Sequence, residues 1–428
     1  MELQEAFNQA LEELGPFEDK PHLAIATSGG SDSLCLVFLA WHWVRQREGT
    51  LTSLIVDHGL RPDSEAEAVQ TRDLLSAHQI PAVILKWTGE KPARRIQERA
   101  REARYGLLLK WCHNHQTLHL LLGHHQDDQR ETFQLRQAKK SGALGLSGMS
   151  ALSETPSVRI LRPLLQFSKS CLREYLTSRN IPFVEDPSNV NLKYSRTVLR
   201  KESLTFSEQA QLIAVSYDYG ICRIQEEKET NQIVSQCVEI FPQGYGLLKK
   251  EHYQQLSEKQ QLNVLQRCFM TFGVGHYPPR RDSLKKIRKN PEITRTLHGC
   301  LIFNYQYWIA FVREPEKIKK ISLTGNAKNY RWDDRFNFSF LPEMYENFSE
   351  LSLAPLEEEG WKHINKTPEG EILKTLPHPV RLGLPVLWER SRFLQLFVPI
   401  SSKFTKKKEC AIHFAPRYPL TRFTFTIV

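Results

Sequence analysis

The sequence predicts an α/β fold with a doubly wound parallel sheet, a helical middle domain and a small α+β C-terminal domain. Two observations lead to this prediction. Between residues 21 and 123, short apolar runs alternate with longer amphipathic stretches. Three of the apolar runs are followed directly by clusters of small, acidic or histidine residues. Because alternating strands and helices form parallel sheets that bind ligands beyond the carboxyl ends of their strands, these polar clusters mark a candidate site.

The elements of the sheet can be assigned in order. Apolar runs predict strands at residues 23–27, 51–57, 81–87 and 118–123. Apolar positions at helical spacing predict helices within residues 32–46, 64–78 and 94–114. Residues 139–200 are expected to form loops and one helix, SKSCLREYLTSRN, which complete a first domain of residues 1–202.

The rest of the chain is expected to form two further domains. Residues 203–318 begin as a polar helix and contain the basic run PPRRDSLKKIRKN, whereas residues 335–428 are richer in proline and aromatic residues. The final RFTFTIV alternates apolar and polar residues, which predicts a half-buried strand.

Composition narrows the class of protein. The chain has 428 residues and a formal net charge of +10, which suits a polyanionic partner such as nucleic acid but is also common on ordinary basic surfaces. None of the 8 cysteines forms a Cys-x-x-Cys pair, which argues against zinc-ribbon, iron–sulfur and thioredoxin-type sites. The sequence shows neither a signal peptide nor an apolar run long enough for a membrane span, so we expect a cytoplasmic protein. It implies no obligate protein partner and leaves a homodimer open.

The first polar cluster is SGGSDS, residues 28–33. A glycine pair lets the backbone approach a ligand, serine hydroxyls donate hydrogen bonds, and the following helix points its positive end at the same place. This combination suits phosphate, although a serine-rich helix cap with Asp32 as a simple capping residue is the structural alternative. The loop has neither the Walker pattern nor the glycine spacing of a dinucleotide-binding fold.

Two more clusters follow later strands. DHGLRPDSE places Asp57 and His58 at the end of the second strand, and GHHQDDQRET at 123–132 places two histidines and two aspartates after the fourth. Adjacent strand residues point in opposite directions, so both histidines are not expected to share one metal ion. Asp127 and Asp128 are expected to hold Mg²⁺ through water or to tune a histidine. A turn at Asp57 and a helix N-cap at Asp127 and Asp128 are the structural alternatives.

The SGGSDS segment resembles the Ser-Gly-Gly-x-Asp-Ser signature of the PP-loop ATP pyrophosphatases, whose domain is adenine nucleotide α-hydrolase-like. The resemblance implies that the loop binds the β- and γ-phosphates of ATP and that Asp32 and Asp128 assist Mg²⁺. The residues expected to bind ATP are Ser28, Gly29, Gly30, Ser31, Asp32, Ser33, Asp57 and His58.

The order of the motifs across residues 20–200 narrows the resemblance. SGGSDS, DHGLR, AREARY, GHHQDDQRET, GLSGM, RPLL and EDPSN follow one another as in the tRNA isoleucine lysidine synthetases. This resemblance implies that the wobble cytidine of a minor isoleucine tRNA is adenylated by ATP on its O2. Free lysine then attacks C2, and AMP leaves. The later chain resembles the family only in its layout.

The resemblance assigns roles to further residues. Asp32, Arg101, Arg104, His124, Asp127 and Asp128 are expected to be catalytic; the two arginines would stabilise the α-phosphate, and His124, Asp127 and Asp128 are alternative bases for lysine. Glu131 and Glu185 are candidates for the lysine α-amine. The residues expected to contact tRNA are Arg196, Arg200, Arg280, Arg281, Lys285, Lys286, Arg288, Lys289, Lys406, Lys407 and Lys408.

Some segments depart from the family pattern. Thr197 stands where an asparagine is usual, KKSGALG has one glycine fewer than expected, and the C-terminal domain lacks a recognisable basic motif. The alternative interpretations are another PP-loop tRNA enzyme, such as a cytidine thiolase, and a tRNA-binding protein without catalysis. The cysteine spacing argues against the thiolase, since such enzymes generally carry paired cysteines.

Overall fold

The computed structural model describes residues 2–89, 96–184, 205–275, 277–323, 329–340, 350–398 and 410–427. The chain divides into two compact units: residues 1–227 with 423–428, and residues 228–422. Within the described residues, no helix is both long enough and apolar enough to cross a membrane.

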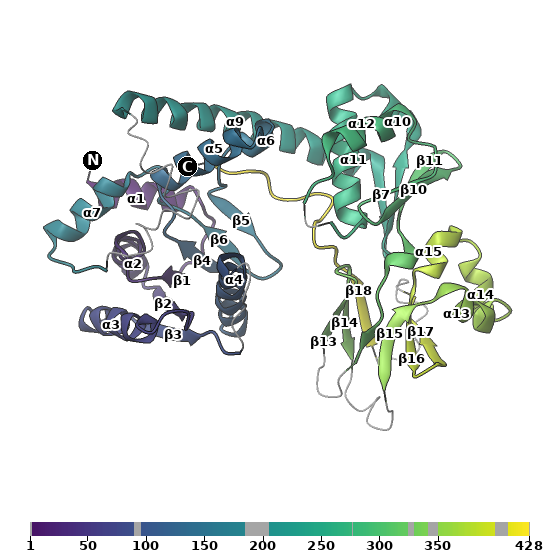
Figure 1. The fold of residues 1–428 in the computed structure, drawn as a ribbon, viewed down its shortest axis with the longest axis horizontal. Coiled ribbons are helices and arrows are strands. Elements are labelled where there is room, and N and C mark those ends of the chain that lie inside the picture. Colours follow the sequence, from purple (N-terminus) through teal and green to yellow (C-terminus); the bar gives the residue numbers. More distant parts are fainter. Residues whose placement is uncertain are drawn as a thin grey trace. The chain divides into compact units, whose positions relative to one another are not determined.

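The first unit is built on a sheet whose described part has six strands in the order β3-β2-β1-β4-β6-β5 (Figure 1). All neighbouring pairs are parallel except β5 with β6. The strands are β1 (His22–Thr27), β2 (Thr50–Asp57), β3 (Ala82–Lys86), β4 (His119–Leu122), β5 (Leu152–Glu154) and β6 (Arg159–Leu161). The four predicted strands are confirmed. The prediction for residues 139–200 was wrong in leaving out β5 and β6, because three-residue strands are too short to show a periodic pattern.

Helices cover both faces of this sheet, as Figure 1 shows for α2 on one side and α4 on the other. The helices of this unit are α1 (Leu3–Glu12), α2 (Ser31–Arg45), α3 (Ser64–Ala77), α4 (Ile96–Asn114), α5 (Gln126–Ala138), α6 (Ala143–Leu146), α7 (Lys169–Ser178) and the first part of α9 (Phe206–Cys237). One core joins α1, α2, α3 and α7 around Trp43 and Leu172. A second core joins Leu108 and Cys112 of α4 to Ala24 and Leu120. The predicted doubly wound α/β class is confirmed.

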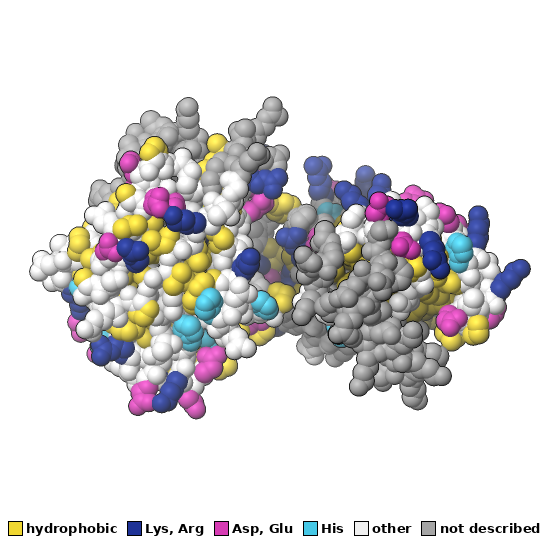
Figure 2. Space-filling model, turned by 90° about the horizontal axis from the view of Figure 1, so that it is seen from below, with side chains coloured by type: hydrophobic (Ala, Val, Ile, Leu, Met, Phe, Trp, Pro, Cys, Tyr) yellow, Lys and Arg dark blue, Asp and Glu magenta, His cyan; other side chains and the backbone are white. Residues whose placement is uncertain are grey.

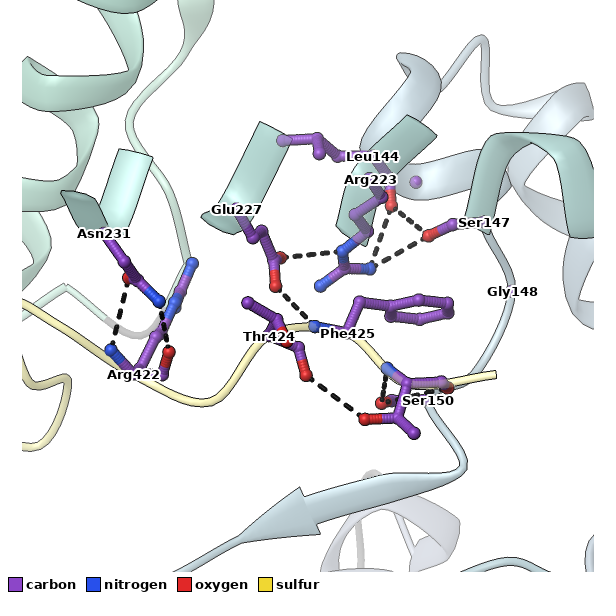
Figure 3. Close-up of polar contacts among 12 residues, drawn as sticks. Leu144, Ser147, Gly148, Ser150, Arg223, Glu227, Asn231, Arg422, Thr424 and Phe425 are labelled. Atoms are coloured by element: carbon purple, nitrogen blue, oxygen red, sulfur yellow. Dashed lines mark hydrogen bonds and ion pairs between the residues drawn. The ribbon is translucent and has the colours of Figure 1, made fainter. Parts of the chain in front are cut away.

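The last described residues of the chain also belong to the first unit. The backbone N–H of Ala151 donates to the carbonyl of Thr426 at 2.8 Å, and the N–H of Phe425 donates to Glu227 Oε2 at 2.6 Å (Figure 3). Residues 422–427 contain no strand, so the predicted C-terminal strand was wrong. The apolar alternation instead reflects Phe425, which is buried, and Phe423, which is exposed.

The second unit combines helices with antiparallel sheets. Its helical region contains the end of α9, α10 (Lys250–Gln255), α11 (Glu258–Phe272) and α12 (Arg281–Lys289). These helices share a core with a sheet, which the sequence analysis did not predict, of order β7-β8-β11-β10-β9 within the described residues. The strands of that sheet are β7 (Val238–Phe241), β8 (Tyr245–Lys249), β9 (Arg295–Leu297), β10 (Cys300–Tyr305) and β11 (Trp308–Arg313).

The remainder of this unit is α+β, as predicted. Its described strands form the sheets β12-β15-β16-β17 and β13-β14-β18. The strands are β12 (Ile321–Ser322), β13 (Asn329–Trp332), β14 (Phe336–Phe340), β15 (Leu351–Pro355), β16 (Pro385–Glu389), β17 (Arg392–Leu396) and β18 (Cys410–Phe414). The helices are η2 (Pro315–Lys317), α13 (Glu357–Ile364), α14 (Pro368–Leu373) and α15 (His378–Leu382). The division at residues 202, 318 and 335 stays a prediction.

Candidate active site

The site lies where the winding of the sheet changes direction. From β1 the chain builds outward through β2 to β3, and then crosses to β4 on the other side of β1. The loops after β1 and β4 therefore leave the sheet at neighbouring positions on its carboxyl edge. In open α/β sheets this switch point is the usual place for a ligand. SGGSDS follows β1, and GHHQDDQ follows β4.

The SGGSDS loop has a backbone that requires glycine at its second position. Gly29 adopts φ +82°, and a Cβ added there would lie 2.4 Å from Thr71 Oγ1. Ser33 Oγ fixes the loop from inside, since it accepts from the Ser28 N–H at 3.1 Å and donates to the Gly30 carbonyl at 3.0 Å. Helix α2 begins at Ser31. The first N–H groups of α2 point out of its N-terminus, where an anion is stabilised by the helix dipole.

A second glycine lets the loop after β4 approach this one. A Cβ added to Gly123 would lie 3.2 Å from the carbonyl carbon and oxygen of Asp32 and from the Cα of Ser33. The backbone at the end of β4 therefore packs directly against the first turn of α2. This close approach brings the first polar cluster of the sequence together with the third.

His125 joins the two loops through three carboxylates. Its Nε2 lies 3.4 Å from Asp32 Oδ2 and 3.7 Å from Asp128 Oδ2, and its Nδ1 lies 3.5 Å from Asp127 Oδ2. Asp128 Oδ2 also accepts the His125 backbone N–H at 3.1 Å. Burial works against the charged imidazolium, but hydrogen bonding with Asp127 and Asp32 and the charges of Asp128 and Asp32 raise the pKa of His125 to about 10. His125 is therefore protonated at neutral pH.

Two cations complete this cluster. Lys169 Nζ lies 3.8 Å from Asp32 Oδ2, and the Lys169 backbone N–H donates to Asp127 Oδ2 at 3.0 Å. Arg130 Nη2 lies 3.1 Å from Asp127 Oδ1. Hydrogen bonding with His125 has the largest effect on Asp127 and, together with the Lys169 backbone N–H and the charges of His125 and Arg130, holds the pKa of its carboxyl well below the usual range. For Asp32, burial alone would raise the pKa, but His125, Lys169 and Ser31 together lower it.

The sequence analysis missed His125 and Lys169. His124 was preferred from the same pair of histidines, yet His125 is the one within 4 Å of all three aspartates. The signal for His125 was present, because it is the residue just before a helix that starts Gln-Asp-Asp. Nothing in the sequence around Lys169 indicates that the first residue of α7 contacts a cluster more than thirty residues earlier in the chain.

The GLSGM segment, residues 145–149, supports α5 through hydrogen bonds to two of its side chains. Gln129 Nε2 donates to the Met149 carbonyl at 2.9 Å, and its Oε1 accepts the Met149 N–H at 2.6 Å. Arg136 donates to the carbonyls of Gly145 and Gly148 at 2.6 and 2.9 Å. The first turn of α5, which carries the aspartates, is thereby fixed to a loop that also contacts the C-terminal segment (Figure 3).

Asp57 and Glu131 lie near this edge in different settings. Asp57 Oδ1 accepts from the Gly59 N–H at 2.9 Å and from Ser64 Oγ at 2.8 Å, so this oxygen holds the turn into α3. Burial tends to raise the pKa of Asp57, but the two hydrogen bonds, together with the charges of Lys86 and His58, lower it. His58 follows Asp57 at the end of β2. Glu131 is on α5, one turn after the aspartates, and is 2% exposed.

The two arginines of AREARY lie on α4 beside one aromatic ring. The guanidinium carbons of Arg101 and Arg104 are 5.0 and 5.8 Å from the centre of the Tyr105 ring. Burial lowers the pKa of Arg104.

Several other predicted residues lie outside the described part of the chain: Glu185, Arg196, Arg200, Lys406, Lys407 and Lys408.

The predicted basic run of the middle region forms an amphipathic helix. Leu284 and Ile287 of α12 are buried in the core of the second unit. Arg288 Nη2 lies 3.3 Å from Glu258 Oε2 and is half-buried. The remaining predicted cations of this run are exposed: Arg280, Arg281, Lys285, Lys286 and Lys289. On the face of the first unit drawn in Figure 2, by contrast, Lys and Arg side chains lie among Asp and Glu side chains.

The acidic cluster has the donor chemistry that Mg²⁺ prefers. Magnesium bound to a nucleotide usually needs one or two protein carboxylates and keeps several waters. The side chain of Asp32 is 27% exposed and that of Asp128 is 15% exposed, so both have oxygen atoms near solvent. Within the described residues, no group of three or more His, Cys, Asp or Glu side chains is arranged to bind a metal by itself. The residues therefore fit a nucleotide-bound Mg²⁺ better than a metal held by protein alone.

Comparison with known proteins agrees with this geometry. Residues 1–205 match the family described as PP-loop domain. The first unit is thus a PP-loop domain, with its signature loop at the switch point of the sheet.

Relatives over most of the chain define the family further. The tRNA(Ile)-lysidine synthase of Wolbachia sp. subsp. Brugia malayi (strain TRS) is 34% identical over 83% of this chain and 84% of its own. The tRNA(Ile)-lysidine synthases of Wolbachia pipientis wMel and Orientia tsutsugamushi (strain Boryong) are 33% and 32% identical, over 81% and 78% of this chain and 81% and 79% of their own. The chain belongs to the tRNA(Ile)-lysidine synthase family.

Proposed function

We propose that this chain joins the ε-amine of free lysine to C2 of the wobble cytidine of a minor isoleucine tRNA, with conversion of ATP to AMP and pyrophosphate. The observation that carries the proposal is the contact between the PP-loop and the GHHQDDQ segment through Asp32 and His125. Membership of the lysidine synthase family supports the same reaction. In this proposal residues 1–202 perform the chemistry in the cytoplasm, and residues 203–318 and 335–428 hold the tRNA.

The loop residues 28–33 would bind the phosphates that leave as pyrophosphate. Backbone N–H groups at the start of α2 would donate to phosphate oxygens, as would the Ser28 hydroxyl, which lies 3.2 Å from Ser33 Oγ. Charge that develops on pyrophosphate is stabilised best by donors fixed in advance. Arg101 and Arg104 remain our candidates for contact with the α-phosphate, and Asp57 and His58 for contact with the nucleoside.

Asp32 and Asp128 would hold Mg²⁺ together with the phosphates. When bound, Mg²⁺ neutralises phosphate charge and orients the leaving group. The protonated imidazole of His125 lies between the aspartates and favours the ionised carboxylates of Asp32 and Asp127. Lys169 adds a second positive charge next to Asp32. The chain's own residues therefore prepare an ionised carboxylate for the cation.

Lysine must lose a proton before it attacks, because the reference pKa of its amine is ~10.4. Of the three predicted bases, Asp127 fits this role least well. Its carboxylate is bonded to the Lys169 N–H and Arg130, and its lowered pKa makes it a weak proton acceptor. His124 and Asp128 remain candidates. Glu131 and Glu185 remain candidates for contact with the lysine α-amine.

The decisive experiment follows the modified base directly. Full-length protein is incubated with ATP, Mg²⁺, lysine and tRNA that carries a wobble cytidine, and the anticodon nucleosides are analysed by mass spectrometry. We expect a cytidine that has gained lysine with loss of water, formed with one AMP and one pyrophosphate. Pyrophosphate release that ignores lysine, or a product that contains sulfur, would overturn the proposal.

The alternative interpretations are not favoured. A cytidine thiolase and a non-catalytic tRNA-binding protein were both consistent with the first motif alone. Relatives that match over 78–83% of the chain are lysidine synthases, and the aspartates of the site are all present.

A matched tRNA with uridine at the wobble position serves as the negative control in the mass-spectrometry experiment.

A further inference from the structure

The second unit contains a cavity that the chemistry above does not use. Its volume is about 350 Å³, and it lies where α10, the end of α11 nearest Ser257, the end of α12 and the start of β11 meet. This volume is within the range of ~300–1,000 Å³ that is typical of small-ligand sites. The lining side chains include Lys250, Tyr253, Gln261, Arg288 and Ile293.

Two polar atoms in its wall lack partners within the described residues. The hydroxyl of Tyr253 and the Nε of Arg288 are buried and have no hydrogen-bond partner there. Tyr253 as a whole is 2% exposed. A buried polar group without a partner is unfavourable, which favours a ligand that supplies one. Gln254 adds an amide group that can both donate and accept, whereas the Gln261 amide already donates to the Tyr253 carbonyl and accepts from Arg288.

An exposed aromatic residue is hydrogen-bonded through its backbone to a residue that lines the cavity. Tyr307, in the turn between β10 and β11, is 85% exposed, and its carbonyl accepts the backbone N–H of Lys250 at 3.3 Å. Ile293, which lines the cavity, is 51% exposed. Exposed aromatic rings close to cations are the usual platform for unpaired bases, because every base has a face that can stack.

The charges around the cavity suit a phosphodiester. Lys250 pairs with Glu292 at 3.2 Å and Arg288 pairs with Glu258 at 3.3 Å, and in both pairs the carboxylate is at least 47% exposed. Because the carboxylate of each pair is exposed to water, its attraction to the cation is weakened, so phosphate can compete for the cations. Lys289 lines the same cavity from the last turn of α12, and Lys285 and Lys286 continue the positive charge along the helix.

We propose that this cavity receives one unpaired nucleotide of the tRNA, with the base against Tyr307 and Ile293 and the neighbouring phosphates along α12. The amide of Gln254 contacts the base edge, and Lys289 contacts the phosphate. This inference rests on the proposed function for its partner, since it names which part of a tRNA the second unit holds. It requires no ATP and no lysine.

Binding of a short RNA tests the proposal. Fluorescence anisotropy compares a labelled single-stranded RNA hexamer with the same sequence in a duplex, using the full-length protein at fixed salt. We expect the single strand to bind at least about tenfold more tightly. Tyr307→Ala should weaken that binding by about 5–100-fold, the range expected for loss of one stacked base. Lys289→Ala should weaken it and reduce the salt slope by about one.

Two further variants test whether the loss of hexamer binding is specific to the cavity. Ile293→Trp fills the cavity from an exposed position and should weaken hexamer binding while circular dichroism stays unchanged. Phe423→Ala is the matched control: Phe423 is 64% exposed and belongs to the first unit, and its loss should change binding less than twofold. A hexamer that binds Tyr307→Ala and Ile293→Trp as well as it binds wild type would overturn the proposal. If the hexamer result overturns the proposal but wild type still forms lysidine, the proposed function is not contradicted.

Discussion

The carboxylate of Asp32 receives interactions from two different loops and one helix. Ser31 Oγ donates to it at 2.9 Å, His125 approaches from the loop after β4, and Lys169 approaches from α7. Each partner favours the ionised carboxylate, and their combined effect exceeds the cost of burial. Asp32 therefore stays negatively charged next to a loop that suits phosphate. A negative charge in that position is favourable only when a cation lies close to it.

Replacing Asp32 by asparagine should separate catalysis from tRNA binding. The amide keeps the size of the side chain but removes the charge that would hold Mg²⁺. We expect pyrophosphate release to fall by at least about 100-fold, comparable with the loss of one transition-state stabiliser, while filter retention of tRNA changes less than twofold. Asp73→Asn, at an exposed site on α3 next to Arg72, is the control and should retain wild-type turnover. Full activity in Asp32→Asn would show that the loop has been misinterpreted.

His119 gives the protein a specific sensitivity to acid. It is 0% exposed on β4, and its Nε2 lies 2.9 Å from Glu18 Oε2. Burial lowers its pKa, with a smaller contribution from Arg159, and Glu18 opposes the shift without cancelling it. The folded state thus holds a neutral ring, whereas the unfolded chain takes up a proton below about pH 6.5. Stability due to this group is present above that pH and is lost as the pH falls.

The corresponding measurement is urea unfolding between pH 5 and 7. Wild type should lose up to about 1.4 kcal/mol per pH unit from this residue as the pH falls below 6.5. His119→Asn should show a flatter dependence, whatever its stability at pH 7. His42→Gln, at an exposed position on α2, should keep the wild-type slope. Equal slopes for His119→Asn and wild type would show that His119 is charged in the folded protein.

Part of the site could be predicted from single residues. Asp32 and the loop glycines were identified because their types match the geometry that phosphate requires. His125 was missed because alternation along a strand does not apply to the residue that leaves the strand and starts a helix. Lys169 was missed because its contact with Asp32 spans 137 residues and depends on how α7 packs against α2. Local patterns carry no information about such contacts.

At the scale of elements, the PP-loop is defined as much by its supports as by its own sequence. Thr71 of α3 lies against Gly29, and the backbone N–H of Val184 donates to the Gly29 carbonyl at 3.0 Å. Gly123 at the end of β4 closes the other side. The loop is therefore held between three segments, which fixes its N–H groups before any ligand binds.

Gly29→Ala should show how strongly this shape is required. A methyl group meets Thr71 Oγ1, and the positive φ adds strain of about 1–3 kcal/mol. We expect lower stability in urea and at least tenfold weaker ATP binding. Gly30→Ala is the matched variant for stability alone, because its φ is −74° and the nearest atom to a new Cβ is 3.6 Å away. Equal stability of the two variants would argue against strain at Gly29.

The elements themselves were predicted to different extents. The first four strands and their helices follow from apolar periodicity, since each is long enough to show it. β5, β6 and the sheet of the middle region were missed. β9, for instance, is Arg295–Leu297, three residues of which only Leu297 is apolar, and its strand state depends on pairing with β10. Short antiparallel strands acquire their structure from partners that the local sequence does not indicate.

At the scale of the whole molecule, the first unit is completed by residues from the end of the described chain. Arg223 of α9 stacks over the Phe425 ring at 4.4 Å, donates to Ser147 Oγ at 3.0 Å and pairs with Glu227 at 2.8 Å (Figure 3). Thr426 N–H donates to Ser150 Oγ at 3.0 Å. These contacts hold the segment after GLSGM, which in turn fixes α5 through Gln129. A segment nearly 300 residues after Asp127 and Asp128 in sequence therefore supports the helix that carries them.

Phe425→Ala should show how strongly the first unit and α5 depend on the C-terminal segment. Phe425 is 4% exposed in the first unit, and loss of a buried phenylalanine ring costs about 3–5 kcal/mol when the surrounding structure cannot collapse. We expect a lower melting temperature by calorimetry and, because α5 loses its support, a lower rate of lysidine formation at saturating tRNA. Phe423→Ala removes the same ring at a site that is 64% exposed and should leave both unchanged. If the two variants melt alike, residues 423–427 rest on the first unit without stabilising it, and the aspartates of α5 must be held by the sheet and α7 alone.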